Sequence, residues 1–147
     1  MIKVKRKKEK VKNGQGFTLV EILVVIGIIG LLAVFLVPNL LGARDRAKEA
    51  GVKGVMHAVQ LAIEAYNMEN SVYPLGTNIA LESLCRNYLM AGDYIAAVPK
   101  NPFTGKEYTD ADVAGKVLYS FDNATGAYTL TGCKRNGLTK ILDLSNM

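Results

Sequence analysis

The chain has 147 residues, of which 50% are apolar and 21% charged, and its formal net charge is +5. This length fits one compact domain with an appendage, and the apolar fraction excludes wholesale disorder. Residues 1–16 hold seven Lys or Arg and one Glu, whereas residues 17–147 hold 11 basic and 12 acidic residues. Because the positive charge is confined to this short head, the body gives no electrostatic reason to expect a nucleic-acid partner.

An apolar segment follows the basic head at residues 17–37, and its only polar side chains are Thr18 and Glu21. As a helix it would reach roughly 32 Å, which matches the hydrocarbon core of a bilayer. Apolar residues on all faces require burial in lipid or in a protein bundle. Since a basic head stays in the cytoplasm, we expect a single-pass protein of the inner (cytoplasmic) membrane with its C-terminal part outside.

Two simpler interpretations of this segment are a cleaved secretory signal and a plain signal anchor. Neither explains the carboxylate of Glu21, because a charge inside a membrane segment is costly and is usually kept for a partner. The alternative for Glu21 is that it is protonated in lipid or reaches the headgroups.

Residues 16–21 read GFTLVE, behind a Lys-rich leader and at the start of the apolar segment. This arrangement resembles the class III signal of type IV pilins and pseudopilins. The resemblance implies that a membrane prepilin peptidase removes the leader, residues 1–16, by cutting between Gly16 and Phe17 and then N-methylates Phe17. Residues 17–40 would form the membrane and assembly half of a long helix, and residues 41–147 a globular domain.

The resemblance also implies roles in assembly for three residues. In a bundle of such helices the carboxylate of Glu21 would pair with the amine of Phe17 in a neighbouring subunit. Gly30 and Pro38 match the mid-helix glycine and the helix-bending proline of the family. Pro38 also removes one backbone hydrogen bond, so we expect a kinked or loosened helix over residues 34–38, with an interruption as the alternative.

The helical pattern continues to about Met68. One stripe is mostly apolar, at Val52, Val55, Val59, Ile63 and Tyr66. A second side has Gly54, Ala58, Leu61 and Ala65, and a polar stripe has Lys53, His57, Gln60, Glu64 and Asn67. We expect the first stripe to pack on this subunit's own sheet. The small-residue side would face other subunits, or alternatively form plain exposed surface.

Turn residues at 70–74 end this helix, and Thr77 or Asn78 is expected to cap a short helix whose apolar face includes Leu84 and Leu89. Residues 92–116 predict loops. Residues 117–121 and 127–131 predict a β-hairpin with a five-residue loop, and residues 138–144 a further strand. The fold class is therefore α+β, a long N-terminal helix packed on a small antiparallel sheet, in agreement with the pilin fold.

Two further sites are considered outside the membrane. In pseudopilins a calcium ion is held by C-terminal loops, and here Asp110, Asp112 and Asp122 are the only donors of that kind. We interpret these three first as solvated turn residues, so no cofactor is expected and calcium is the alternative. An oxidising exterior favours a disulfide between Cys85 and Cys133, with two buried free thiols as the alternative.

The sequence predicts a structural filament subunit and not an enzyme, because the lone His57 has no nucleophile near it and no phosphate loop or metal spacing is present. A DNA-uptake role for Lys134, Arg135 and Lys140 would rest on three cations only.

The leader and the hairpin favour a type IV pilus filament, with uses such as adhesion, motility or DNA uptake. The alternative, favoured by the NPFTGKEY sequence of residues 101–108, is a major pseudopilin of type II secretion in a periplasmic pseudopilus. Partners would be other copies of the chain, the prepilin peptidase, the inner-membrane assembly platform and the membrane.

Overall fold

The computed structural model describes residues 16–146, and most of the predicted leader lies outside them. The chain divides into two units, one up to Leu40 and one from Leu41 onward. Helix α1 runs without interruption from Leu19 to Asn70. The remaining elements, in chain order, are β1 (Ile79–Ala80), α2 (Leu81–Leu84), the π-helical turn η1 (Cys85–Leu89), β2 (Val117–Asp122), β3 (Ala127–Cys133) and β4 (Lys140–Ser145).

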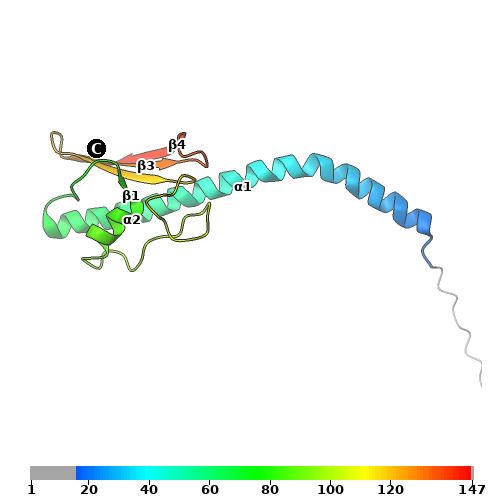
Figure 1. Ribbon diagram of the computed structural model, residues 1–147, viewed down its shortest axis with the longest axis horizontal. Helices are drawn as coiled ribbons and strands as arrows, with labels where there is room; N and C mark the ends of the chain where they lie inside the picture. Colours follow the sequence, from blue (N-terminus) through cyan, green and yellow to red (C-terminus); the bar gives the residue numbers. More distant parts are fainter. Residues whose placement is uncertain (1–15, 147) are drawn as a thin grey trace, which may run out of the picture. The chain divides into compact units, whose positions relative to one another are not determined.

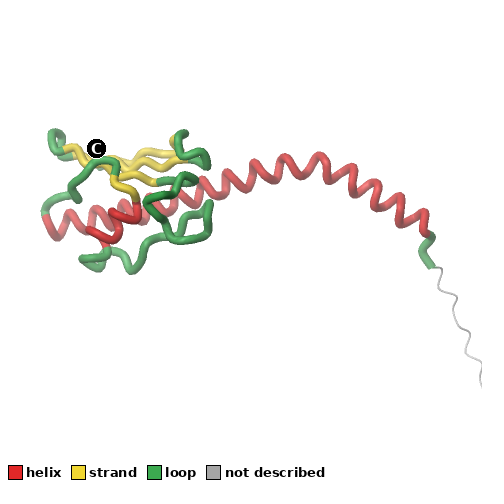
Figure 2. The backbone as a smooth tube through the Cα atoms, in the orientation of Figure 1, coloured by secondary structure: helices red, strands yellow, loops and turns green. Residues whose placement is uncertain are grey.

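The second unit has two layers, the later part of α1 and a four-stranded sheet along it (Figures 1 and 2). The strand order is β1-β2-β3-β4 and all neighbours are antiparallel. This confirms the predicted α+β, pilin-like fold. The strands β2 and β3 are the predicted hairpin, but Asp122 pairs with Ala127, so the loop has one residue fewer than expected. β1 was not predicted.

The core forms between one stripe of α1 and the inner face of the sheet. Val52, Val59 and Ile63 are fully buried, which confirms the predicted packing stripe. Met56 is buried beside them, and a Cβ at position 132 of β3 would overlap its sulfur, so Gly132 lets the sheet approach the helix closely. The sheet contributes fully buried side chains to the same cluster at Val117, Tyr119, Tyr128 and Leu130.

Glu64 lies in the predicted polar stripe but is only partly exposed, because two tyrosines hold it. The hydroxyl of Tyr128 donates to Glu64 Oε1 at 2.6 Å, and the hydroxyl of Tyr73 donates to Oε2 at 3.0 Å. Burial and the hydrogen bond to Glu64 raise the pKa of Tyr128 above its usual value. This carboxylate therefore joins α1 to the sheet instead of facing solvent.

The short helix begins at Leu81, and Ala80 at its N-cap makes no side-chain bond. The predicted caps Thr77 and Asn78 were therefore wrong. The cap comes instead from a carboxylate distant in sequence, since Asp110 Oδ1 accepts the backbone N–H of Ser83 at 3.1 Å. An N–H of the first helical turn has no partner within the helix, which is why an outside acceptor is used.

The loops of residues 92–116 are organised by Asn101, the only buried polar residue in the described part of the chain. Its side-chain Nδ2 donates to Ala114 O at 2.8 Å and to Asp112 Oδ2 at 3.0 Å. Its Oδ1 accepts the backbone N–H of Phe103 at 2.9 Å. One amide thus satisfies polar groups from the middle and from the end of this long connection.

The substitution Asn101→Ala should lower the free energy of unfolding by about 2 kcal/mol, because it leaves partly buried backbone groups without their partners and removes a buried amide. Urea unfolding followed by tyrosine near-ultraviolet circular dichroism measures this change. Asn123→Ala, at the exposed hairpin tip, is the matched control and should stay within about 0.5 kcal/mol of the unsubstituted chain. Equal stability of the two variants would contradict the role given to Asn101.

Candidate functional site

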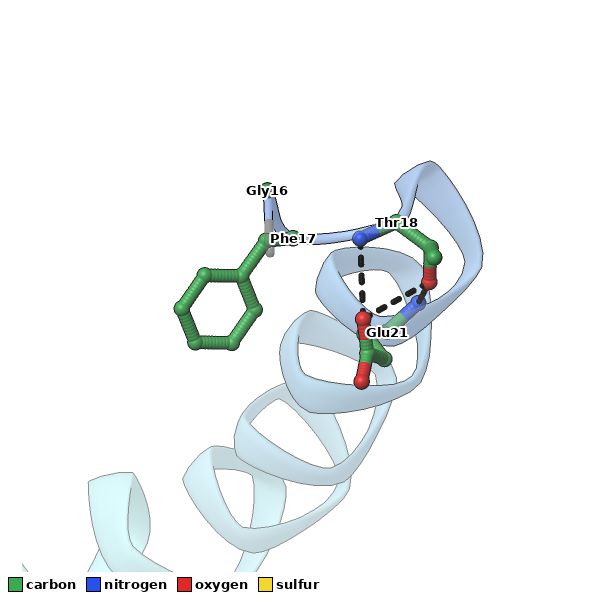
Figure 3. Close-up of a pocket in the computed structure, with 4 residues that line it drawn as sticks. All are labelled: Gly16, Phe17, Thr18 and Glu21. Carbon is green, nitrogen blue, oxygen red and sulfur yellow. Dashed lines mark hydrogen bonds between the residues drawn. The ribbon is translucent and has the colours of Figure 1, made fainter. Parts of the chain in front are cut away.

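The amino end of α1 is closed by Thr18 and Glu21 (Figure 3). The backbone N–H and the hydroxyl of Thr18 both donate to Glu21 Oε2 at 2.8 Å, and the N–H of Glu21 donates back to Thr18 Oγ1 at 3.2 Å. This is a capping box, in which two residues three apart satisfy each other's N–H groups at a helix start. Glu21 therefore has a structural role in the isolated subunit.

This cap leaves two groups free for other partners. Oε1 of Glu21 accepts no hydrogen bond from the described residues, since all the bonds go to Oε2. The nitrogen of Phe17 takes no part in the cap, and its ring points away from Thr18 and Glu21 (Figure 3). Cleavage before Phe17 would thus leave the capping box intact. The T-x-x-E spacing of residues 18–21 is a sequence signal for this box, although the box was not among the predictions above.

The segment behind this cap is long and apolar enough to cross a membrane. Every large apolar side chain from Phe17 to Val37 is between 50% and 84% exposed in the isolated chain. Gly30 lies in this segment, and a Cβ there would meet nothing within 4 Å. The subunit itself therefore does not require a glycine at position 30. Pro38 lies within α1, and the interruption considered for it is not seen.

The three aspartates considered for calcium are each bonded within the chain. Asp110 accepts hydrogen bonds from the backbone N–H and the hydroxyl of Ser83. Asp112 accepts the backbone N–H of Thr109 at 3.1 Å. Asp122 accepts the N–H of Ala124 at 2.9 Å, which lowers its pKa below the usual value. Among the residues that the structure describes, no three His, Cys, Asp or Glu side chains gather as a metal site would require.

The two cysteines are buried as free thiols in this structure. Cys85 lies in η1 within the core cluster, and Cys133 ends β3. Burial raises the pKa of the Cys85 thiol to about 12 and also raises that of Cys133, so both are poor nucleophiles at neutral pH. The bridge between them stays a prediction.

The three cations considered for DNA uptake each form an ion pair within the subunit. Lys134 and Arg135 form ion pairs with Glu49 and Asp45 of α1, and Lys140 pairs with Asp143 at 2.9 Å. His57 is exposed on α1. The cations considered for DNA uptake thus pair with carboxylates of their own subunit.

Comparison with known proteins agrees with this geometry. A family model described as the prokaryotic N-terminal methylation motif matches residues 11–37. The type II secretion system core protein G of Vibrio cholerae is 40% identical over 108 residues, which cover 68% of this chain and 72% of that protein. The chain belongs to the type II secretion system core protein G family. This is a family of structural pseudopilins and not of enzymes, as the sequence predicted.

Other members of the core protein G family give the same result. The protein of Escherichia coli K12 is 40% identical over 103 residues, covering 64% of this chain and 69% of that protein. The protein of Klebsiella pneumoniae is 39% identical over 103 residues, covering 64% and 71%. No solved structure matches the chain. The chain is a prepilin of the type IV pilin kind, anchored in the membrane by its apolar helix before assembly.

Proposed function

We propose that this chain is the major subunit of a pseudopilus, the short filament of a type II secretion system. The observation that supports this most is its similarity to core protein G over more than two thirds of both the chain and its Vibrio cholerae relative. The type IV pilus filament, which the leader and hairpin favoured, has less support. Adhesion and motility have none from these relatives.

In this proposal the subunit waits in the inner membrane and is then stacked with copies of itself by an inner-membrane assembly platform. The exposed apolar half of α1 supports such a double use, because lipid and a bundle of like helices are both apolar surroundings. Residues 17–40 would be the assembly half of the helix and residues 41–147 the globular domain on the filament surface. Gly30 would allow neighbouring helices to approach closely, and Pro38 would bend or loosen the helix.

Deleting the gene should stop the export of proteins that cross the outer membrane, while sheared surface filaments should not contain this chain. Mass spectrometry of the sheared fraction and of the culture medium measures both results. Restoration of export by the unsubstituted gene is the control. Finding the chain as the main subunit of sheared surface filaments, with export unchanged, would support the type IV pilus instead.

The leader cut is proposed to lie between Gly16 and Phe17, with methylation of the new amine. Gly16→Val should block removal of the leader, because the larger side chain no longer fits where a peptidase must approach the backbone. Intact-mass measurement should find the full-length chain in this variant. The matched control Gly14→Val, two residues upstream, should give a chain that begins at a methylated Phe17. A normal mature chain from Gly16→Val would exclude the assigned cut.

We also propose that Glu21 Oε1, which the capping box leaves free, pairs with the α-amine of Phe17 in a neighbouring subunit. Glu21→Gln keeps an acceptor for Thr18 but removes the charge, so filament yield should fall about tenfold or more, since an unpaired buried ammonium costs several kcal/mol. Thr18→Val is the matched control: it weakens the cap by about 1 kcal/mol but keeps the carboxylate.

Filament yield is measured by pelleting assembled pseudopili and quantifying the chain, with membrane insertion checked by alkaline extraction. Thr18→Val should assemble within about twofold of the unsubstituted chain. Wild-type yield from Glu21→Gln, or equal losses in both variants, would mean that Glu21 acts through the helix cap and not through a partner's amine.

A further inference from the structure

A cationic pocket lies at the start of the second unit, where α1 leaves the apolar segment. It has a volume of about 320 Å³ and is lined by Leu41, Arg44, Asp45, Lys48 and Arg135. The first four residues are spaced by three and four along α1 and therefore share one helix face. Arg135 comes from the connection between β3 and β4, which the ion pair to Asp45 holds against this face.

Two of the three cations are fixed by neighbouring groups. Lys48 Nζ donates to the carbonyl of Phe103 at 3.1 Å and lies 5.7 Å from the centre of the Phe103 ring. The guanidinium carbon of Arg135 lies 5.8 Å from the same ring. Cations over an aromatic face are attracted by the ring, so the loop residue Phe103 holds both near the pocket. A ligand here would meet charges that are already in place, which lowers the entropy lost on binding.

The pocket has more positive than negative charge. Arg44, Lys48 and Arg135 face a single carboxylate, Asp45, and that carboxylate is paired with Arg135. Arg44 is exposed and has no carboxylate within 4 Å among residues 16–146. An unpaired guanidinium beside a fixed ammonium is a suitable receptor for a phosphate group, because both supply N–H donors to its oxygens.

The position of the pocket in the chain indicates which phosphate it meets. Leu41 begins the pocket one residue after the unit that crosses the membrane, and Arg44 is only four residues beyond Leu40. Four residues of chain reach at most about 14 Å, whatever the angle between the two units. Arg44 therefore lies at the depth of the lipid headgroups while the subunit is in the membrane. The exposed side chain of Leu41 suits the adjoining acyl region.

The charges of this segment also need an explanation. Residues 41–53 hold four Lys or Arg, on the side of the membrane where such residues are normally few. The leader still has more of them, so orientation is kept, but cations here work against it. A ligand with negative charge on this side would account for the two of them that line the pocket, Arg44 and Lys48.

We propose that this pocket binds the phosphate of an anionic phospholipid, in the leaflet on the side of the globular domain, while the subunit waits in the membrane. Bound lipid would fix the height of the domain above the bilayer. Releasing it would be one step of extraction into a filament. The inference rests on membrane anchoring and not on the pseudopilus, so it holds for any filament built from this chain.

The test uses the full chain in phosphatidylcholine vesicles with a trace of spin-labelled phosphatidylglycerol or spin-labelled phosphatidylcholine. Electron paramagnetic resonance gives the preference of the protein for the anionic lipid over the zwitterionic one. The variant R44Q/K48Q removes two cations and should lower this preference at least fivefold, since about fivefold is the effect of a single cation at a membrane surface. The matched control R46Q/K53Q removes the same charge from exposed positions of the same helix outside the pocket, and should change the preference less than twofold.

The leader is present in every chain and contributes equally to each measurement. If R44Q/K48Q loses its tyrosine circular dichroism, the single variants Arg44→Gln and Arg46→Gln replace the pairs, because Arg44 makes no hydrogen bond with the described residues. Equal losses in pocket and control variants would mean diffuse attraction and would overturn the proposal. So would an unchanged preference in the pocket variant, which would leave a carboxylate of a neighbouring subunit as the partner.

Inorganic phosphate separates a lipid site from a site for free anions. Added phosphate should weaken the lipid preference no more than chloride at the same ionic strength, because the lipid is held by its position as well as its charge. Complete loss with phosphate alone would assign the pocket to a free anion and contradict the proposal.

Discussion

From Leu19 to Val37 helix α1 has apolar side chains on every face, and none of the large ones is less than half exposed in the isolated chain. Each such side chain left in water costs about 2 kcal/mol relative to an apolar surrounding, so this segment needs lipid or other helices at every stage. The basic leader, the cap at the start of the helix and the charges beyond Leu40 are all consistent with this requirement. The globular domain does not need such surroundings, because its core forms without any residue of this segment.

Glu21 shows how a carboxylate can lie at the start of such a helix. Its Oε2 satisfies the helix end through Thr18, so the isolated subunit does not hold a carboxylate without hydrogen-bond partners. The two oxygens therefore differ in their hydrogen bonds: Oε2 bonds within the subunit, and Oε1 is the oxygen for which a neighbour's amine is proposed. A glutamine would keep an acceptor for Thr18 without the charge that this proposed pairing needs, whereas an apolar residue would supply neither.

The sequence predicted the features whose signal is local. The apolar run, the GFTLVE motif, the packing stripe of α1 and the β2–β3 hairpin follow from patterns within a few residues, and the structure has the helix and strands among them. Contacts between distant segments had no such signal. Asp110 caps α2 from 27 residues away, Glu64 meets Tyr128 across the domain, and β1 has two residues only. Only the T-x-x-E cap has a local signal and was not predicted.

The stripe of α1 that packs on the sheet leaves the opposite side of the helix open. Leu61 is 72% and Met68 85% exposed, and Gly54 and Ala58 lie exposed with them. Since the core is complete without these residues, covering them would not require the domain to refold. Assembly can then proceed by rigid docking, which loses less conformational entropy than coupled folding would. Glu21 resembles the helix in this respect: its Oε2 bonds within the subunit, whereas its Oε1 accepts no hydrogen bond from the described residues.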